Sequence, residues 1–212
     1  MDIKAIIFDI DGTLTEHVSW VCLTEGLGAS IDAHDVIYQA YLSEAITYEE
    51  SKEQLISLWR GTGRADRRTM VGIFDAIPLR ENAVKTVNSL TEKGYLTCLI
   101  TGSMDLYAAA VASKFKNTEW YANTRLIFNE EDMIIDYEYH RDQVAKKIEH
   151  LSDFCERHSI LPTECAVVGN GENDVGIFAL TGNGILFGTE LEGHPDGVTR
   201  TISNLTELRD IF

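Results

Sequence analysis

The sequence lacks the marks of a membrane, secreted or disulfide-stapled protein. No apolar run approaches the roughly 20 residues that cross a bilayer. The N-terminal apolar run is short and is closed by Asp9 and Asp11, unlike a signal peptide. The 4 cysteines among 212 residues are scattered and form no CxxC pair, which disfavours a disulfide framework or a zinc cluster. We expect a cytoplasmic protein with reduced thiols.

Basic residues are also scarce. The chain has 18 Lys and Arg against 34 Asp and Glu, a formal net charge of −16. Such a chain repels nucleic-acid backbones and anionic membranes, so we expect neither as a partner. An anionic small molecule, such as a phosphorylated metabolite, would need a local cation to offset this field.

Four short apolar runs alternate with segments of helical periodicity. The runs are residues 4–8, 95–100, 164–168 and 184–187. Strands that alternate with helices predict an α/β fold, a Rossmann-like and mainly parallel sheet covered by helices on both faces.

A long helical insert interrupts this alternation at residues 16–79. Thr47 and Glu50 form the pattern of a capping box and predict the start of a helix. An insert of this length should form its own small bundle, and Pro78 marks the return to the sheet. We therefore predict a core of residues 1–15 and 80–212 with a cap of residues 16–79.

Two smaller features follow in the second half of the chain. Residues 124–139 have apolar segments on both sides of an acidic turn at 129–132, which predicts a β-hairpin. Residues 203–212 predict a capped terminal helix.

Polar side chains follow three of the predicted strands, at the edge where parallel sheets bind ligands. Asp9 and Asp11 follow the first, Thr101 and Gly102 the second, and residues 170–174 the third. Asp9 and Asp11 are two apart and face the same side of an extended chain, where two carboxylates repel. A divalent cation such as Mg²⁺ resolves that repulsion. The alternative is an Asx-type turn without chemistry.

The run Asp9-Ile10-Asp11-Gly12-Thr13-Leu14-Thr15 resembles the first motif of the haloacid dehalogenase superfamily. Ile100-Thr101-Gly102 resembles its second motif, and residues 168–174 resemble its fourth. The helical insert is similar to the C1-type cap of that superfamily. The resemblance covers nearly the whole chain, and the phosphoserine-phosphatase-like subgroup is the most similar.

This resemblance implies a two-step hydrolysis of a phosphomonoester. Asp9 would attack phosphorus and form an aspartyl-phosphate. Asp11 would protonate the leaving oxygen and then activate water. Thr101 and the amide of Gly102 would hold phosphate oxygens.

The resemblance also implies a Mg²⁺ site, with one departure. The implied ligands are Asp9, the backbone carbonyl of Asp11, and the fourth motif. The family usually has Asp where this chain has Asn170, which supplies an oxygen but no charge. We expect weaker metal binding, partly compensated by Asp174 from outside direct contact.

The third motif of the superfamily is a lysine, and helical periodicity locates it. Four apolar residues share one face of a predicted helix: Val144, Ile148, Leu151 and Cys155. Lys147 lies at the margin of that face, whereas Lys146 lies on the opposite, polar side with His150. Lys147 also stands 23 residues before Asn170, so it is the candidate cation for Asp9 and the phosphate. The alternative is a surface lysine whose stem covers the core.

Three functions are compatible with these residues. The first is a phosphatase that acts on a small phosphorylated metabolite, the second a phosphomutase of the same superfamily, and the third a non-catalytic binding or regulatory protein. Dehalogenation is disfavoured because it does not need Asp11. The resemblance implies that phosphoserine phosphatases hold the amino acid with an acidic residue and a cap arginine, but those places hold Val18 and Leu55, with Glu16 and Arg60 nearby.

Overall fold

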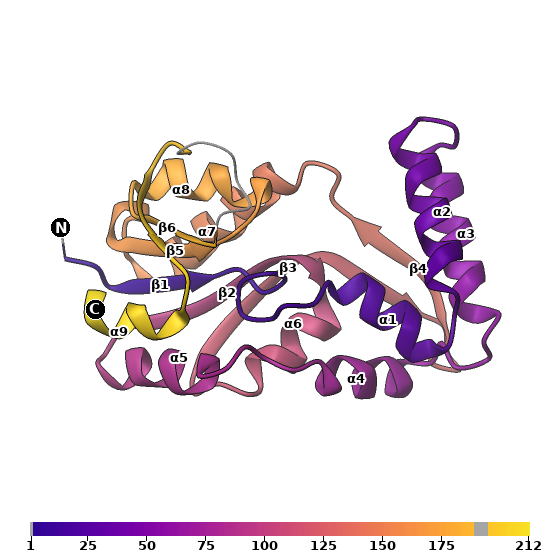
Figure 1. Cartoon of the computed structure of the whole chain (residues 1–212), viewed down its shortest axis with the longest axis horizontal. Coiled ribbons are helices and arrows are strands. Elements are labelled where there is room, and N and C mark those ends of the chain that lie inside the picture. The colour runs from indigo at the N-terminus through magenta and orange to yellow at the C-terminus, as the bar shows by residue number, and fades with distance from the viewer. Residues whose placement is uncertain (1, 189–194) are drawn as a thin grey trace.

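The computed structural model describes residues 2–188 and 195–212. Within these residues the strands form one seven-stranded sheet in the order β4-β3-β2-β1-β5-β6-β7 (Figure 1). The strands are β1 (Ala5–Phe8), β2 (Leu96–Met104), β3 (Thr118–Phe128), β4 (Ile134–Tyr139), β5 (Cys165–Gly169), β6 (Gly184–Phe187) and β7 (Val198–Ile202). All neighbours are parallel except β3 and β4. The predicted α/β class with a mainly parallel sheet is confirmed.

Helices cover both faces of the sheet, as Figure 1 shows. One face carries α5 (Ala83–Glu92), α6 (Asp105–Ala112) and α9 (Leu208–Ile211), and the other carries α7 (Gln143–His158) and α8 (Val175–Thr181). Successive side chains of β1 point to opposite faces of the sheet and pack under the two helical layers. Ile6 and Phe8 join the first apolar cluster, whereas Ala5 and Ile7 join the second.

The register of the central strands brings their carboxyl ends together. Phe8 of β1 lies opposite Leu99 of β2 and Val168 of β5. The backbone N–H of Asp9 donates to the carbonyl of Val168 at 2.9 Å. β2 runs on to Met104, with a register shift between Thr101 and Met104, so the prediction that this strand ends at residue 100 was wrong.

The inserted segment is helical, as predicted. Its helices are α1 (Ser19–Leu27), α2 (Ile31–Leu42), α3 (Tyr48–Arg60) and α4 (Arg67–Ala76). The capping box at the start of α3 is present. The Thr47 hydroxyl accepts from the backbone N–H of Glu50 at 3.2 Å, and the Glu50 carboxylate accepts from the backbone N–H of Thr47 at 2.8 Å.

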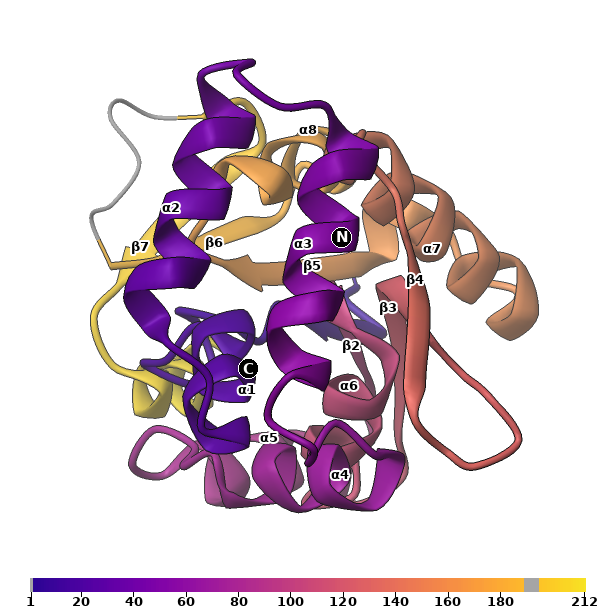
Figure 2. The same cartoon turned by 90° about the vertical axis from the view of Figure 1, so that its right-hand side faces the viewer.

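The insert packs on the rest of the chain as well as on itself. α1 and α4 pack together and α4 lies against α6, whereas α2 and α3 stand side by side with α3 against β4 (Figure 2). Phe74 of α4 packs on Tyr107 of α6 with ring centroids 5.4 Å apart. One buried apolar cluster therefore runs through both regions, and the expectation that the insert forms a bundle of its own stays a prediction. The cap boundaries at residues 16 and 79 remain a prediction.

The predicted hairpin is β3 and β4, which pair antiparallel around residues 129–133. β3 begins at Thr118, earlier than predicted, because its first half pairs with β2. The terminal helix is present as a short 3₁₀ turn followed by α9, with Asn204 accepting from the N–H of Thr206 at 2.9 Å. Among the described residues, no helix combines the length and apolarity that crossing a bilayer requires.

Candidate active site

A buried lysine joins two buried carboxylates at the carboxyl end of β1. Lys147 extends from α7, and its Nζ lies 2.6 Å from Oδ1 of Asp9 and 2.6 Å from Oδ1 of Asp174. The Lys147 side chain is 0% exposed. A charge in this position is tolerated only because it is paired on both sides.

The two adjacent lysines of α7 point in different directions, as helical periodicity predicts. Lys146 pairs with Glu149 at 2.5 Å, far from the buried network that holds Lys147. His150, however, is buried and packs on Tyr121 with ring centroids 5.2 Å apart. The prediction that His150 is on the polar side was wrong, because β3 covers a wider face of α7 than the apolar stripe indicates.

Asn170 lies on the opposite side of Asp9 from Lys147. The Thr13 hydroxyl donates to Oδ1 of Asn170 at 3.0 Å and is 3.5 Å from Oδ2 of Asp9. The Thr13 hydroxyl thus holds an amide oxygen and a carboxylate oxygen close together. Gly12 makes room for this approach, because it has a φ of +77° and a Cβ there would lie 2.3 Å from Nδ2 of Asn170.

Asp174 holds the loop that carries Asn170. Its Oδ2 accepts from the backbone N–H of Gly171 at 3.1 Å, and its Oδ1 accepts from Lys147. Both oxygens therefore contact protein groups, which places Asp174 behind the site. Its contribution to metal binding remains a prediction, and these contacts favour an indirect one.

Asp11 is held from one side by the start of α1. Its Oδ2 accepts from the hydroxyl of Ser19 at 2.6 Å and from the backbone N–H of Ser19 at 3.2 Å. The Ser19 hydroxyl also contacts the hydroxyl of Ser103. Oδ1 of Asp11 is buried and makes no hydrogen bond of normal geometry among the described residues, although the Tyr107 hydroxyl is near enough to lower the pKa of Asp11. A buried carboxyl oxygen without such a bond points to a group that the bound molecule supplies.

Burial shifts the protonation of these groups. It raises the pKa of Asp9 to about 7, against the opposing attraction of Lys147. It also raises the pKa of Asp11, although the hydrogen bonds from Ser19 lower it. For Lys147, burial lowers the pKa, but the charges of Asp174 and Asp9 outweigh it and the net shift is upward. Burial therefore makes both carboxyl groups weaker acids than a carboxyl group in water.

Thr101 and Gly102 lie on β2, directly beside β1. Thr101 is buried, and its hydroxyl accepts from the backbone N–H of Ser103 at 3.1 Å. Gly102 lies against the side chains of Gln143 and Asn173, and a Cβ at Gly102 would be 2.5 Å from Oε1 of Gln143. The fold thus brings all the predicted strand ends to one edge of the sheet.

The donors at this edge fit a hard divalent cation. Asp9, Asp11 and Asp174 carry up to three negative charges, and Lys147 supplies one positive charge. Asp9 and Asn170 offer hard oxygen atoms around one hydroxyl, the chemistry that Mg²⁺ prefers. Within residues 2–188 and 195–212, no three His, Cys, Asp or Glu side chains are grouped closely enough to hold a metal ion. A site here therefore needs the Asn170 oxygen or backbone carbonyls.

Sequence reasoning missed Ser19 and Tyr107. Tyr107 lies within hydrogen-bonding distance of Thr15, at 3.3 Å, and is fully buried. These residues belong to no motif, and only the return of α1 and α6 to the sheet edge brings them to the site.

The sequence matches a family model and two curated proteins. The family model of haloacid dehalogenase-like hydrolases matches residues 3–181. A phosphoserine phosphatase of Archaeoglobus fulgidus is 25% identical over 190 residues, which cover 87% of this chain and 52% of that protein. A phosphoserine phosphatase of Methanocaldococcus jannaschii is 23% identical over 184 residues, covering 87% of this chain and 85% of that protein. The chain thus spans about half the length of the first relative.

A solved structure supports the same fold. A substrate-bound phosphoserine phosphatase complex superposes with a TM-score of 0.74 over 100% of this chain and 99% of the other, at 21% identity. At that identity the likeness shows the fold.

Proposed function

The chain belongs to the haloacid dehalogenase-like hydrolases, and on that premise we propose that it is a Mg²⁺-dependent phosphatase of small phosphomonoesters. The observation that carries the proposal is the pair Asp9 and Lys147, in contact at 2.6 Å at the buried end of β1, with Asp11 two residues away. Phosphomonoester hydrolysis is extremely slow without a catalyst, so a nucleophile and strong charge stabilisation are both needed.

In the first step, the Asp9 carboxylate attacks phosphorus and the bond from phosphorus to the ester oxygen breaks. Lys147 orients the attacking carboxylate and offsets negative charge on the phosphoryl group. Thr101 and the Gly102 amide lie beside β1, where they can donate to phosphoryl oxygens. The product is an aspartyl-phosphate on Asp9 and a free alcohol.

Asp11 handles the protons of both steps. In its protonated form, Asp11 can donate a proton to the leaving alkoxide, and burial raises its pKa in the direction that favours this form. The resulting carboxylate then takes a proton from a water molecule, which attacks the aspartyl-phosphate and releases phosphate. Ser19 keeps Oδ2 of Asp11 in place throughout, leaving Oδ1 for the substrate or water.

Asp9, Asn170 and the backbone carbonyl of Asp11 are the groups that would hold Mg²⁺. When bound, Mg²⁺ would neutralise phosphoryl charge and keep the Asp9 carboxylate ionised in spite of its burial.

Hydrolysis of 4-nitrophenyl phosphate, with and without Mg²⁺, tests this proposal on wild type and Asp9→Asn. We expect metal-dependent turnover in the wild type and a loss of at least about 1,000-fold in the variant, because an amide cannot form the intermediate. Asp153→Asn, in an exposed carboxylate of α7, is the matched control and should retain wild-type turnover. Equal turnover by wild type and Asp9→Asn would reject Asp9 as the nucleophile.

A further inference from the structure

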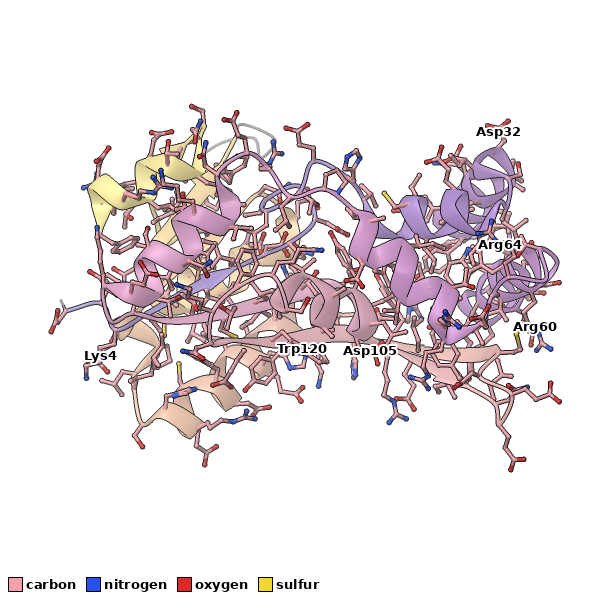
Figure 3. The ribbon with its side chains drawn as sticks, turned by 90° about the horizontal axis from the view of Figure 1, so that it is seen from below. Lys4, Asp32, Arg60, Arg64, Asp105 and Trp120 are labelled. Carbon is pink, nitrogen blue, oxygen red and sulfur yellow. The ribbon has the colours of Figure 1, made fainter. Side chains whose placement is uncertain are left out.

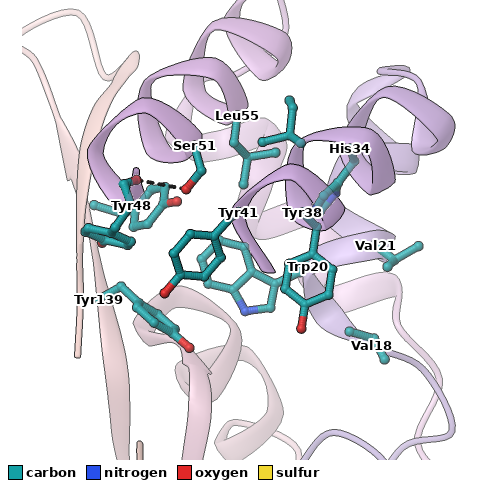
Figure 4. A pocket seen from close by; sticks show the side chains of 12 residues that line it. Val18, Trp20, Val21, His34, Tyr38, Tyr41, Tyr48, Ser51, Leu55 and Tyr139 are labelled. Atoms are coloured by element: carbon teal, nitrogen blue, oxygen red, sulfur yellow. Dashed lines mark hydrogen bonds between the residues drawn. The ribbon is translucent and has the colours of Figure 1, made fainter. Parts of the chain in front are cut away.

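An aromatic cavity opens between the inserted segment and β4, and two of its lining residues flank Ser19. It has a volume of about 450 Å³ and is enclosed by α1, α2, α3 and β4 (Figure 4). Six aromatic side chains line it: Trp20, Tyr38, Tyr41, Tyr48, Tyr137 and Tyr139. Its size is within the range of about 300–1,000 Å³ that is typical of small-molecule sites.

The aromatic rings form a continuous wall. Trp20 meets Tyr137 edge-on with ring centroids 5.4 Å apart, and it meets Tyr139 at 6.2 Å. Tyr139 in turn stacks on Tyr48 at 6.1 Å. Tyr38 is nonetheless 51% exposed and Val18 53% exposed at the cavity edge. An open apolar surface of this kind gains free energy when an apolar group covers it.

The cavity and the catalytic site share a short segment of chain. Val18 and Trp20 line the cavity, and Ser19 between them donates to Oδ2 of Asp11 at 2.6 Å. Asp11 is the group that would protonate the leaving alcohol. An alcohol protonated by Asp11 would therefore be released near residues 18–20, the segment that also contributes to the cavity wall.

The cavity has no charge with which to bind an amino acid. None of the described residues that line it is Asp, Glu, Lys or Arg. Glu16 instead pairs with Arg80 at 2.9 Å, and Arg60 lines a separate surface depression. Figure 3 shows Arg60 at the outer end of the molecule, remote from Lys4 at the start of β1. The ammonium group of phosphoserine would lose hydration here without gaining a carboxylate partner from the lining.

A cationic alcohol is also disfavoured. Two positive side chains already lie over the Tyr48 ring, with Nζ of Lys52 at 5.8 Å and Cζ of Arg141 at 5.9 Å from its centroid. The imidazole of His34 is within hydrogen-bonding distance of Thr24, at 2.7 Å, and does not add a negative charge. Although Lys52 is paired with Glu49 and Asp136, it and Arg141 already occupy the Tyr48 ring and leave a third cation no free aromatic face there.

We infer that the preferred substrate is a phosphomonoester of an uncharged alcohol that carries an aromatic or similarly flat apolar ring. This inference rests on the proposed phosphatase function and names its substrate class. The ring would pack on the part of the wall formed by Trp20 and Tyr139, while the phosphate lies at Asp9.

Four substrates test the inference on the intact protein at one Mg²⁺ concentration: benzyl phosphate, ethyl phosphate, phosphoserine and phosphocholine. All are esters of primary alcohols, so the comparison reports mainly on recognition rather than on leaving-group reactivity. We expect kcat/KM for benzyl phosphate to exceed that for each of the others by about tenfold or more, through stacking and ring burial.

Two variants of α2 link the preference to the cavity. Tyr38→Ser removes a half-exposed lining ring and should lower the ratio of kcat/KM for benzyl phosphate to that for ethyl phosphate by about fivefold. Val36→Ser, at a 68% exposed position outside the lining, is the matched control and should leave that ratio unchanged.

The outcomes separate the two proposals. No hydrolysis of any of the four esters would contradict the phosphatase function itself. Hydrolysis with phosphoserine or phosphocholine preferred, or with benzyl and ethyl phosphate equal, would leave the phosphatase standing and overturn the inferred substrate class. A ratio that is unchanged in Tyr38→Ser would also overturn it.

Discussion

The end of β1 and the aromatic cavity of the insert differ in almost every physical respect. At the end of β1, charged side chains are buried and paired, as in the contacts of Lys147 with Asp9 and Asp174. In the cavity, lining side chains such as Tyr38 are uncharged and partly open to solvent. The first arrangement suits bond breaking, because fixed charges act strongly where water is excluded. The second suits selection among substrates, because apolar contacts discriminate by shape and hydration.

This contrast predicts two kinds of mutational effect. A change at the end of β1 should alter turnover of every substrate by a similar factor. A change in the cavity should alter the ratio between substrates and leave the chemistry intact. The predictions below test the division, beginning with the largest effect.

Lys147→Met should cause the largest loss. Turnover of every phosphomonoester should fall by about 100- to 1,000-fold, because the phosphoryl charge and Asp9 lose their cation. The variant should also be less stable by about 3–5 kcal/mol, because two buried carboxylates are left without a partner. Steady-state kinetics and urea unfolding measure the two effects.

Lys146→Met is the matched control, one residue away on the same helix. Its lysine pairs with Glu149 at the surface, so turnover should stay within about twofold of wild type. Equal losses in the two variants would remove the distinction between a buried catalytic lysine and its surface neighbour.

Asn170→Asp should produce a smaller and opposite effect. A second carboxylate oxygen near Asp9 should lower the Mg²⁺ concentration for half-maximal activity by about tenfold. The Thr13 hydroxyl already donates to this position and can donate to a carboxylate as well. A Mg²⁺ titration of activity measures the change, and an unaltered midpoint would show that residue 170 is not a ligand.

Thr47→Ala should have the smallest effect, confined to the insert. Losing the cap of α3 should lower the melting temperature by about 2–4 °C, with turnover of ethyl phosphate unchanged. The backbone N–H of residue 47, which the variant keeps, and the Thr47 hydroxyl, which it loses, both lower the pKa of Glu50 from its ordinary value of 4.5. The stability that the hydroxyl adds through the Glu50 carboxylate is complete above that pH. The difference between wild type and variant should therefore shrink as the pH falls below about 4.5. A difference that grows in acid would contradict the capping box.

The sequence was most informative where function depends on local order. Asp9, Asp11 and Gly12 are adjacent in the chain, and a strand followed by a tight turn places them with little help from the rest of the fold. Helical periodicity separated Lys147 from Lys146, because burial of one helix face is itself a periodic property, and the superfamily's third motif and the spacing to Asn170 supported the same choice.

Features that depend on contacts between distant segments were harder to predict from the sequence. β7 was missed because three of its five residues are exposed and it has little apolar signal. The cavity draws its rings from α1, α2, α3 and β4, and no spacing relates them. Trp59 is fully buried whereas Trp20 lines the cavity, although both are tryptophans of inserted helices. Only tertiary packing separates the two roles.

The position of Ser19 has a consequence for engineering. This residue supports Asp11 and also lies between two residues of the cavity lining. A change in residues 18–20 can therefore affect both the reaction and substrate recognition. In a chimera with a foreign cap joined at residue 15, residues 18–20 would come from the foreign protein together with the rest of its cap. A junction at residue 21 would instead keep the native Val18 and Trp20 while the cavity residues of α2 and α3 are exchanged. The specificity transferred that way should be incomplete.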